Sequence, residues 1–303
     1  MRDTSVIERR EPGDVKVMRA CLKHWPFQRG KGVLMRLFKP KLNNRYFLME
    51  IEPGIMVPAE LDDYMIYWCF VHGYYKEPPH EFSRSLIRPG DTVMDVGANI
   101  GLWAMGAALQ AGPQGSIHAF EPVAENFARL TDNLALNNLG ADRVLCHQVA
   151  LSDRCGSAVF YRATNGNSGM GALAQREGVD QPIATSLRTL DSYCDENGIG
   201  RVDFIKVDVE GAELLVFRGA SQLLASADAP AIMFEVNDSH AASFSSSSVA
   251  VKTFLRQQGY DIFRYDGKTL EPVPANQGHQ HEDLFAFKSY HFERHPMLNS
   301  LRR

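Results

Sequence analysis

Long apolar segments are missing from this sequence. None of its runs approaches 18 apolar residues, and the first residues are charged, without the apolar stretch of a secretory signal peptide. Cysteine is scarce too: the five present are an odd number without a close pairing pattern, and no Cys-x-x-Cys or clustered Cys/His group suggests a structural metal. We therefore expect a cytoplasmic protein with reduced cysteines that does not insert stably into a membrane.

Positive charge is also in deficit. The formal net charge of −4, from 32 Lys/Arg and 36 Asp/Glu, argues against a nucleic-acid partner. The deficit is uneven, because residues 1–41 hold 11 Lys/Arg and 4 Asp/Glu and so carry +7, which leaves −11 on the rest of the chain. This basic arm could bind anionic lipid, a nucleotide-linked sugar or an acidic partner, or it could be a solvated N-terminal tail.

What the sequence does contain is a strand, a glycine turn and a helix in immediate succession. Thr92–Val96 is a short apolar run that predicts a buried strand. Gly97 and Gly101 bracket a tight turn, and Leu102–Ala111 is apolar almost all round, which predicts a buried helix. Together these segments form the first half of a nucleotide-binding βαβ unit.

The residues of the turn indicate which nucleotide it binds. A dinucleotide site needs a second glycine where this chain has Asn99, and the Asp95 carboxylate would repel a pyrophosphate at short range. S-adenosylmethionine has no phosphate and carries a cationic amino acid end, so it suits both residues. We predict that Asp95, Gly97, Asn99 and Gly101 line the site of this cofactor.

The next two predicted strands supply the remaining cofactor residues. The second strand ends at Glu121, where an acid can accept hydrogen bonds from both ribose hydroxyls, and Pro122 begins the following helix. The third strand is followed by Ser152 and Asp153, which we expect near the adenine. Asp153 could accept the adenine amino hydrogen, or it could simply form a turn.

Three motifs in this order resemble the FkbM family of S-adenosylmethionine-dependent methyltransferases: Asp95–Gly101, Phe120–Pro122 and Lys206–Glu213. The resemblance covers residues 81–236. Characterised members of this family mostly methylate hydroxyls on sugars, polysaccharides or polyketide-type natural products. The resemblance therefore implies an S-adenosylmethionine-dependent O-methyltransferase of natural-product or polysaccharide biosynthesis, with a hydroxyl-bearing small molecule or saccharide as acceptor.

The whole pattern predicts an α/β fold. We expect a Rossmann-like methyltransferase sheet of seven strands, mostly parallel with an antiparallel last strand, and a ligand crevice at the strands' carboxyl ends. Residues 81–303 would form this domain, and residues 1–80 a small, basic and aromatic-rich extension that caps the crevice. The aromatic cluster at 60–75 could line the acceptor pocket or pack against the sheet, and the glycine-rich segment 164–171 could be a lid or a surface loop.

Methyl transfer to a hydroxyl needs a group that removes the proton. Asp208 and Glu210 follow the fourth predicted strand, Glu235 ends the fifth, and His240 comes shortly after, so these four are the catalytic candidates. Lys206 could neutralise one of the acids. We expect metal-independent catalysis because the sequence shows no compact run of three acids at these strand ends. A divalent metal, if one takes part, would be held by Asp208 and Glu235.

Two other classes of function stay open on the sequence. One is a catalytically silent module that binds S-adenosylmethionine, and the other is a nicotinamide-dependent oxidoreductase on a related sheet. The presence of Asp95 and Glu121 counts against the first, and Asn99 in place of a second glycine counts against the second. Neither the acceptor nor the oligomeric state has a signature in the sequence.

Overall fold

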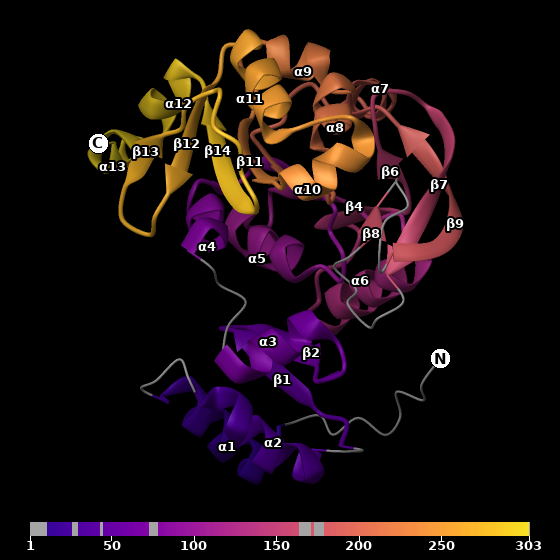
Figure 1. Ribbon diagram of the computed structural model, residues 1–303, viewed down its shortest axis with the longest axis vertical. Helices are drawn as coiled ribbons and strands as arrows, with labels where there is room; N and C mark the ends of the chain where they lie inside the picture. The colour runs from indigo at the N-terminus through magenta and orange to yellow at the C-terminus, as the bar shows by residue number, and fades with distance from the viewer. Residues whose placement is uncertain are drawn as a thin grey trace.

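An eight-stranded sheet lies at the centre of the molecule (Figure 1). The structure is a computed structural model that describes residues 11–25, 30–42, 45–72, 78–163, 171–172 and 179–302. The strands of this sheet are β3 (Thr92–Val96), β4 (Ser116–Phe120), β5 (Val144–His147), β10 (Phe204–Val207), β11 (Ala231–Val236), β12 (Asp261–Tyr265), β13 (Leu270–Pro272) and β14 (Glu282–Phe287).

The strand order is β13-β12-β14-β11-β10-β3-β4-β5. The strands from β5 to β11 are parallel neighbours, and β14 runs antiparallel between β11 and β12. The predicted Rossmann-like α/β fold is thus confirmed, with eight strands rather than seven because β13 folds back on β12 as an edge hairpin. The chain builds outward from β3 to β5 and then returns to place β10 on the other side of β3. This switch point places a crevice at the carboxyl ends of β3 and β10.

Helices cover both faces of the sheet, and a separate apolar cluster lies under each layer (Figure 1). Eight of the ten residues of α5 are buried, as its apolar sequence predicts, because this helix packs against β3, β4 and α4. Among the described residues, no helix combines the length and the apolar character needed to span a membrane. The helices of this domain are α4 (Pro78–Ser85), α5 (Leu102–Ala111), α6 (Ala124–Leu136), α7 (Leu190–Glu196), α8 (Glu213–Arg218), α9 (Ser221–Ala225), α10 (Asp238–Ala241), α11 (Ser248–Gln257), α12 (Ser289–Arg294) and α13 (Met297–Leu301).

A second sheet, in the order β6-β9-β7-β8, lies on the side of the molecule away from β12 and β13 (Figure 1). It consists of β6 (Ala150–Leu151), β7 (Gly156–Ala163), β8 (Gly171–Ala172) and β9 (Val179–Arg188). The sequence predicts only a short strand at Val159–Tyr161, whereas β7 pairs with β9 along its whole length. Of the predicted lid, residues 164–170 lie outside the described residues.

The N-terminal extension packs beneath the main domain (Figure 1). It consists of α1 (Gly13–Lys23), α2 (Lys31–Leu42), the hairpin of β1 (Leu48–Glu52) and β2 (Ile55–Pro58), and α3 (Tyr64–His72).

Polar contacts fix the extension to the domain. At the end of α6, the Asn137 side chain accepts a hydrogen bond from the Met56 N–H and donates one to the Met56 carbonyl, both at 2.7 Å. Asp63 pairs with Arg129 of α6 at 2.7 Å. The apolar core of the extension is continuous with the cluster under one face of the sheet. The extension and the domain therefore share one core.

Candidate active site

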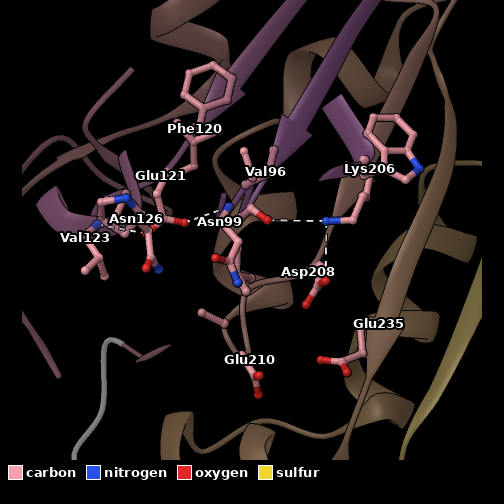
Figure 2. Close-up of a pocket in the computed structure, with 18 of the residues that line it drawn as sticks. Val96, Asn99, Phe120, Glu121, Val123, Asn126, Lys206, Asp208, Glu210 and Glu235 are labelled. Carbon is pink, nitrogen blue, oxygen red and sulfur yellow. Dashed lines mark hydrogen bonds and ion pairs between the residues drawn. The ribbon is translucent and has the colours of Figure 1, made fainter. Parts of the chain in front are cut away.

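A cleft opens at the carboxyl ends of β3, β4, β10 and β11 (Figure 2). Its space amounts to about 1020 Å³ with the open solvent at its mouth included, which is enough for a ligand of cofactor size. Seven of the twelve predicted site residues line it: Gly97, Asn99, Glu121, Pro122, Asp208, Glu210 and Glu235. The other five lie outside the lining: Asp95, Gly101, Ser152, Asp153 and His240.

Glu121 joins the turn after β3 to the start of α6. Its Oε2 accepts a hydrogen bond from the Asn99 N–H at 2.9 Å, and its Oε1 accepts from the Val123 N–H at 2.9 Å and from the Asn126 side chain at 3.4 Å (Figure 2). Burial raises the pKa of Glu121 to about 7, although these donors lower it. Each carboxylate oxygen has two lone pairs, so Glu121 can also accept hydrogen bonds from hydroxyl groups in the cleft.

The glycine turn after β3 is shaped by the protein's own packing. Gly97 and Gly101 have positive φ angles of 82° and 86°. A Cβ on Gly97 would overlap the backbone carbonyl oxygen of Asp208, and a Cβ on Gly101 would overlap the side chain of Leu130. Gly97 thus lets the ends of β3 and β10 approach, and Gly101 lets the turn pack on α6.

Lys206 is a buried cation shared by two acids. Its Nζ lies 3.2 Å from Asp95 Oδ1 and 3.3 Å from Asp208 Oδ2. Asp95 is 0% exposed, and burial raises its pKa while Lys206 lowers it. The structure therefore places Asp95 behind the wall of the cleft. Asp208 lies in the cleft (Figure 2). Among the lining residues that the structure describes, Lys206 alone carries a permanent positive charge.

The turn after β10 adopts an uncommon backbone conformation and is held by Glu213. Glu210 has a φ of 58° and Gly211 a φ of 104°, in the left-handed region that few non-glycine residues occupy. The Glu213 carboxylate accepts hydrogen bonds from the Gly211 N–H at 3.0 Å and the Val209 N–H at 3.4 Å. Burial raises the pKa of Glu213 to about 7. Glu213 thus fixes the turn that presents Asp208 and Glu210 to the cleft.

Glu235 is a nearly buried acid at the end of β11. Its Oε1 lies 2.9 Å from Nδ1 of His281, a residue that the sequence did not single out as a partner. Burial, and after it the negative charge of Asp208, raises the pKa of Glu235 to about 8. The hydrogen bond to Glu235 raises the pKa of His281 to about 9. The acids at the ends of β10 and β11 therefore share one electrostatic environment, as parallel neighbouring strands predict.

His240 joins these acids from α10. Its Nδ1 lies 2.6 Å from Glu210 Oε2. The Asn237 side chain caps α10 by accepting hydrogen bonds from the Ser239 and His240 N–H groups. A Cβ on Gly211 would overlap the His240 backbone, so only glycine allows the turn after β10 to touch this helix. His240 thus lies beside the cleft rather than in its lining.

The residues predicted near the adenine are placed differently. The cleft is lined by Val149, Ala150 and Leu151 on this side. Ser152 is buried, and its N–H donates to the Arg188 carbonyl at 2.9 Å. Asp153 pairs at 3.2 Å with an exposed arginine, Arg154. The residues before Ser152, rather than Ser152 and Asp153 themselves, line the cleft.

Some lining residues were missed at the level of sequence. Asn126 lies in the helix that follows β4, so helical periodicity could have found it. Met65 of α3 and Phe160 of β7 come from other segments of the chain and have no local signal. None of the described aromatic residues of α3 lines the cleft; Trp68 and His72 instead stack on each other with ring centroids 3.9 Å apart.

These features define the class of the protein as a Rossmann-like α/β enzyme whose cofactor cleft is not built for a dinucleotide. The model of the methyltransferase FkbM domain matches residues 95–262, more than half of the chain. The chain belongs to the FkbM family of methyltransferases.

Relatives in this family are moderately similar. The 31-O-demethyl-FK506 methyltransferase FkbM of Streptomyces tacrolimicus is 34% identical over 182 residues, covering 51% of this chain and 67% of that protein. The 2-O-methyltransferase NoeI of Sinorhizobium fredii is 31% identical over 154 residues, covering 46% of this chain and 61% of NoeI. A crystal structure of a methyltransferase FkbM from Methylobacillus flagellatus is 15% identical with a TM-score of 0.43, covering 74% of this chain and 52% of that one. The chain thus spans between half and two thirds of the length of these proteins.

Proposed function

We propose that the protein transfers a methyl group from S-adenosylmethionine to a hydroxyl of a sugar, polysaccharide or polyketide-type natural product. The observation that carries the proposal is Glu121, a buried carboxylate at the end of β4 that lines the cleft with both oxygens held by amide donors. The acceptor class is supported by relatives whose names specify hydroxyl or sugar methylation, such as NoeI and the hexuronic acid methyltransferase AglP of Haloferax volcanii.

The cofactor half of the cleft extends from the turn after β3 to the end of β5. Glu121 would accept hydrogen bonds from the ribose hydroxyls, and the backbone at Val149–Leu151 would lie against the adenine. Asn99 would lie near the amino acid end of the cofactor. When bound, S-adenosylmethionine supplies an electrophilic methyl group.

The acceptor half lies at the ends of β10 and β11. A hydroxyl attacks well only as its proton leaves, and a positioned base typically contributes about 10²–10⁴-fold to the rate. Asp208 lines the cleft, and its Oδ2 lies 3.3 Å from Lys206 Nζ. We assign proton removal to Asp208, with Glu210, Glu235 and His240 around the acceptor.

The cofactor assignment is tested with Glu121→Ala. The variant should bind S-adenosylhomocysteine at least ~10-fold more weakly in calorimetry, because each hydrogen bond to a charged group is worth about 1.5–3 kcal/mol. Glu121→Gln, which keeps the size of the side chain, guards against a folding defect, and both variants need an unchanged thermal midpoint. The exposed Glu125 in the first turn of α6 provides the control, since Glu125→Ala should bind S-adenosylhomocysteine like the parent. Parental affinity in the folded Glu121 variants would contradict the ribose assignment.

The activity itself is tested with methyl-labelled S-adenosylmethionine and a panel of hydroxyl compounds that includes hexuronic acids, oligosaccharides and macrolides. Label should appear in an ether product of at least one acceptor. Binding of S-adenosylhomocysteine without transfer to any acceptor in the panel would favour a silent binding module.

A further inference from the structure

Three side chains converge at the mouth of the cleft from three different elements. Glu210 comes from the turn after β10, Glu235 from the end of β11 and His240 from α10. One carboxylate oxygen of each acid and one ring nitrogen of the histidine lie within 4.8 Å of one another. The cap on α10 and the glycine contact between α10 and the β10 turn hold these elements in place. The three donors are therefore positioned by the fold rather than by flexible loops.

Two atoms of this cluster lack the hydrogen bonds that buried polar atoms normally make. The side chain of Glu235 is only 10% exposed, and its Oε2 has no hydrogen-bond partner among the described residues. Within the same part of the chain, His240 Nδ1 is also buried without a hydrogen bond: it lies 2.6 Å from Glu210 Oε2 but outside hydrogen-bond geometry. A carboxylate oxygen and a ring nitrogen that meet outside hydrogen-bond geometry are both ligand atoms of the kind that a shared cation takes.

The charge of the region supports a cation. Four acids (Asp95, Asp208, Glu210 and Glu235) gather at these strand ends. Lys206 is already shared by the first two and His281 pairs with Glu235 Oε1, which leaves the acids in excess. Two carboxylates and one imidazole combine the oxygen ligands that suit Mg²⁺ and Mn²⁺ with a nitrogen ligand that suits transition metals. We propose that Glu210, Glu235 and His240 bind a divalent cation, for which Mn²⁺ is the fitting probe.

The role of this cation rests on the proposed function. Three protein ligands leave coordination positions for water or for the acceptor hydroxyl. A hydroxyl bound there has a lowered pKa, so that the carboxylate of Asp208 is a sufficient base: the O–H proton passes to Asp208, the oxygen bonds to the methyl carbon and the methyl–sulfur bond breaks with its electrons on sulfur. This proposal departs from the metal-independent chemistry and from the Asp208–Glu235 ligand pair expected from sequence, because Lys206 engages Asp208.

The test is Mn²⁺ binding by the full chain after chelator treatment, without cofactor or acceptor. Titration followed by the electron paramagnetic resonance signal of free Mn²⁺ should show one specific site, and pulsed spectra should show coupling to one imidazole nitrogen. Glu235→Gln and His240→Gln should each weaken binding at least ~10-fold, since even outer partners of ligands cost 10–100-fold, and His240→Gln should remove the nitrogen coupling. Thermal midpoints and S-adenosylhomocysteine affinity show that the variants are folded.

Two controls decide between ligand sets. The exposed Glu196 of α7 pairs with Arg188 and is not part of the cleft lining, so Glu196→Gln should leave Mn²⁺ binding unchanged. Asp208→Asn should also retain the site. Loss of Mn²⁺ binding in Asp208→Asn with retained binding in His240→Gln would overturn this ligand set and favour the Asp208–Glu235 pair expected from sequence. Absence of any specific Mn²⁺ site would also overturn the proposal. The Mn²⁺ titration contains no cofactor, so a negative result there would not contradict the proposed methyltransferase activity. Conversely, failure to bind S-adenosylhomocysteine would not contradict a Mn²⁺ site.

Discussion

At the scale of single residues, burial acts against ionisation of the acids around the cleft. Glu121 follows β4 and Glu213 begins α8, and burial raises the pKa of each to about 7. Both accept backbone N–H groups, which favour the ionised form and only partly offset the loss of water. Each carboxylate therefore holds a turn in place at a free-energy cost that depends on pH.

Glu213→Gln tests this cost. In the unfolded chain Glu213 has its ordinary pKa of 4.5 and releases its proton above that pH. In the folded chain its pKa is about 7, so the proton stays bound up to about pH 7. Stability is therefore highest at low pH and falls as pH rises through this window, by at most about 1.4 kcal/mol per pH unit for one group. The glutamine keeps an acceptor oxygen for the Gly211 N–H, so the variant should show a flatter dependence in urea unfolding between about pH 5 and 8. Glu196→Gln should run parallel to the parent, and a Glu213→Gln curve of the parental slope would contradict the argument.

At the scale of elements, the parts of the fold that depend on local signals were predictable from sequence. The strand, glycine turn and helix at 92–111 follow from apolar runs and from glycines that this backbone needs. The acids at the ends of β10 and β11 could be grouped because parallel strands bring their carboxyl ends together. The length of β7 and β9 was not predictable. Each strand is extended by pairing with the other, and neither sequence alone indicates that pairing.

The glycine turn is tested with a matched pair of substitutions. Gly97 and Gly54 both have a φ of 82°, but a Cβ on Gly97 would overlap the Asp208 carbonyl, whereas a Cβ on Gly54 meets nothing within 4 Å. Gly54→Ala should lower the free energy of unfolding only by the cost of a left-handed backbone, about 1–2 kcal/mol. In urea unfolding, Gly97→Ala should lower the free energy of unfolding clearly more, because β3 and β10 must separate at the base of the cleft. Equal losses would show that conformation alone, and not the strand contact, requires Gly97.

At the scale of the whole molecule, the cleft is completed by segments far apart in the chain. Met65 of the extension and Phe160 of the second sheet line it together with the strand ends. Sequence patterns could not place them, since neither lies in a motif and both reach the cleft through tertiary packing. The sulfur of Met65 accepts a hydrogen bond from the Asn99 side chain at 3.2 Å, which links the extension directly to the glycine turn after β3.

The extension is expected to contribute to acceptor selection and turnover, and not to cofactor affinity. Deleting residues 1–40 would test this division, but it would also remove Val15, Met18 and Leu22, which are buried in the shared core, so the deletion is informative only if thermal unfolding shows a folded remainder.

Met65→Ala tests the same division without removing core residues of α1. The variant should lose roughly 10-fold in kcat/KM for the acceptor, the effect of removing apolar contacts from a pocket, while S-adenosylhomocysteine affinity in calorimetry stays near the parent. Leu37→Ala provides the control, because Leu37 is 67% exposed on the extension and outside the cleft. A loss of S-adenosylhomocysteine affinity with unchanged acceptor kinetics would instead assign Met65, through Asn99, to the cofactor half of the cleft.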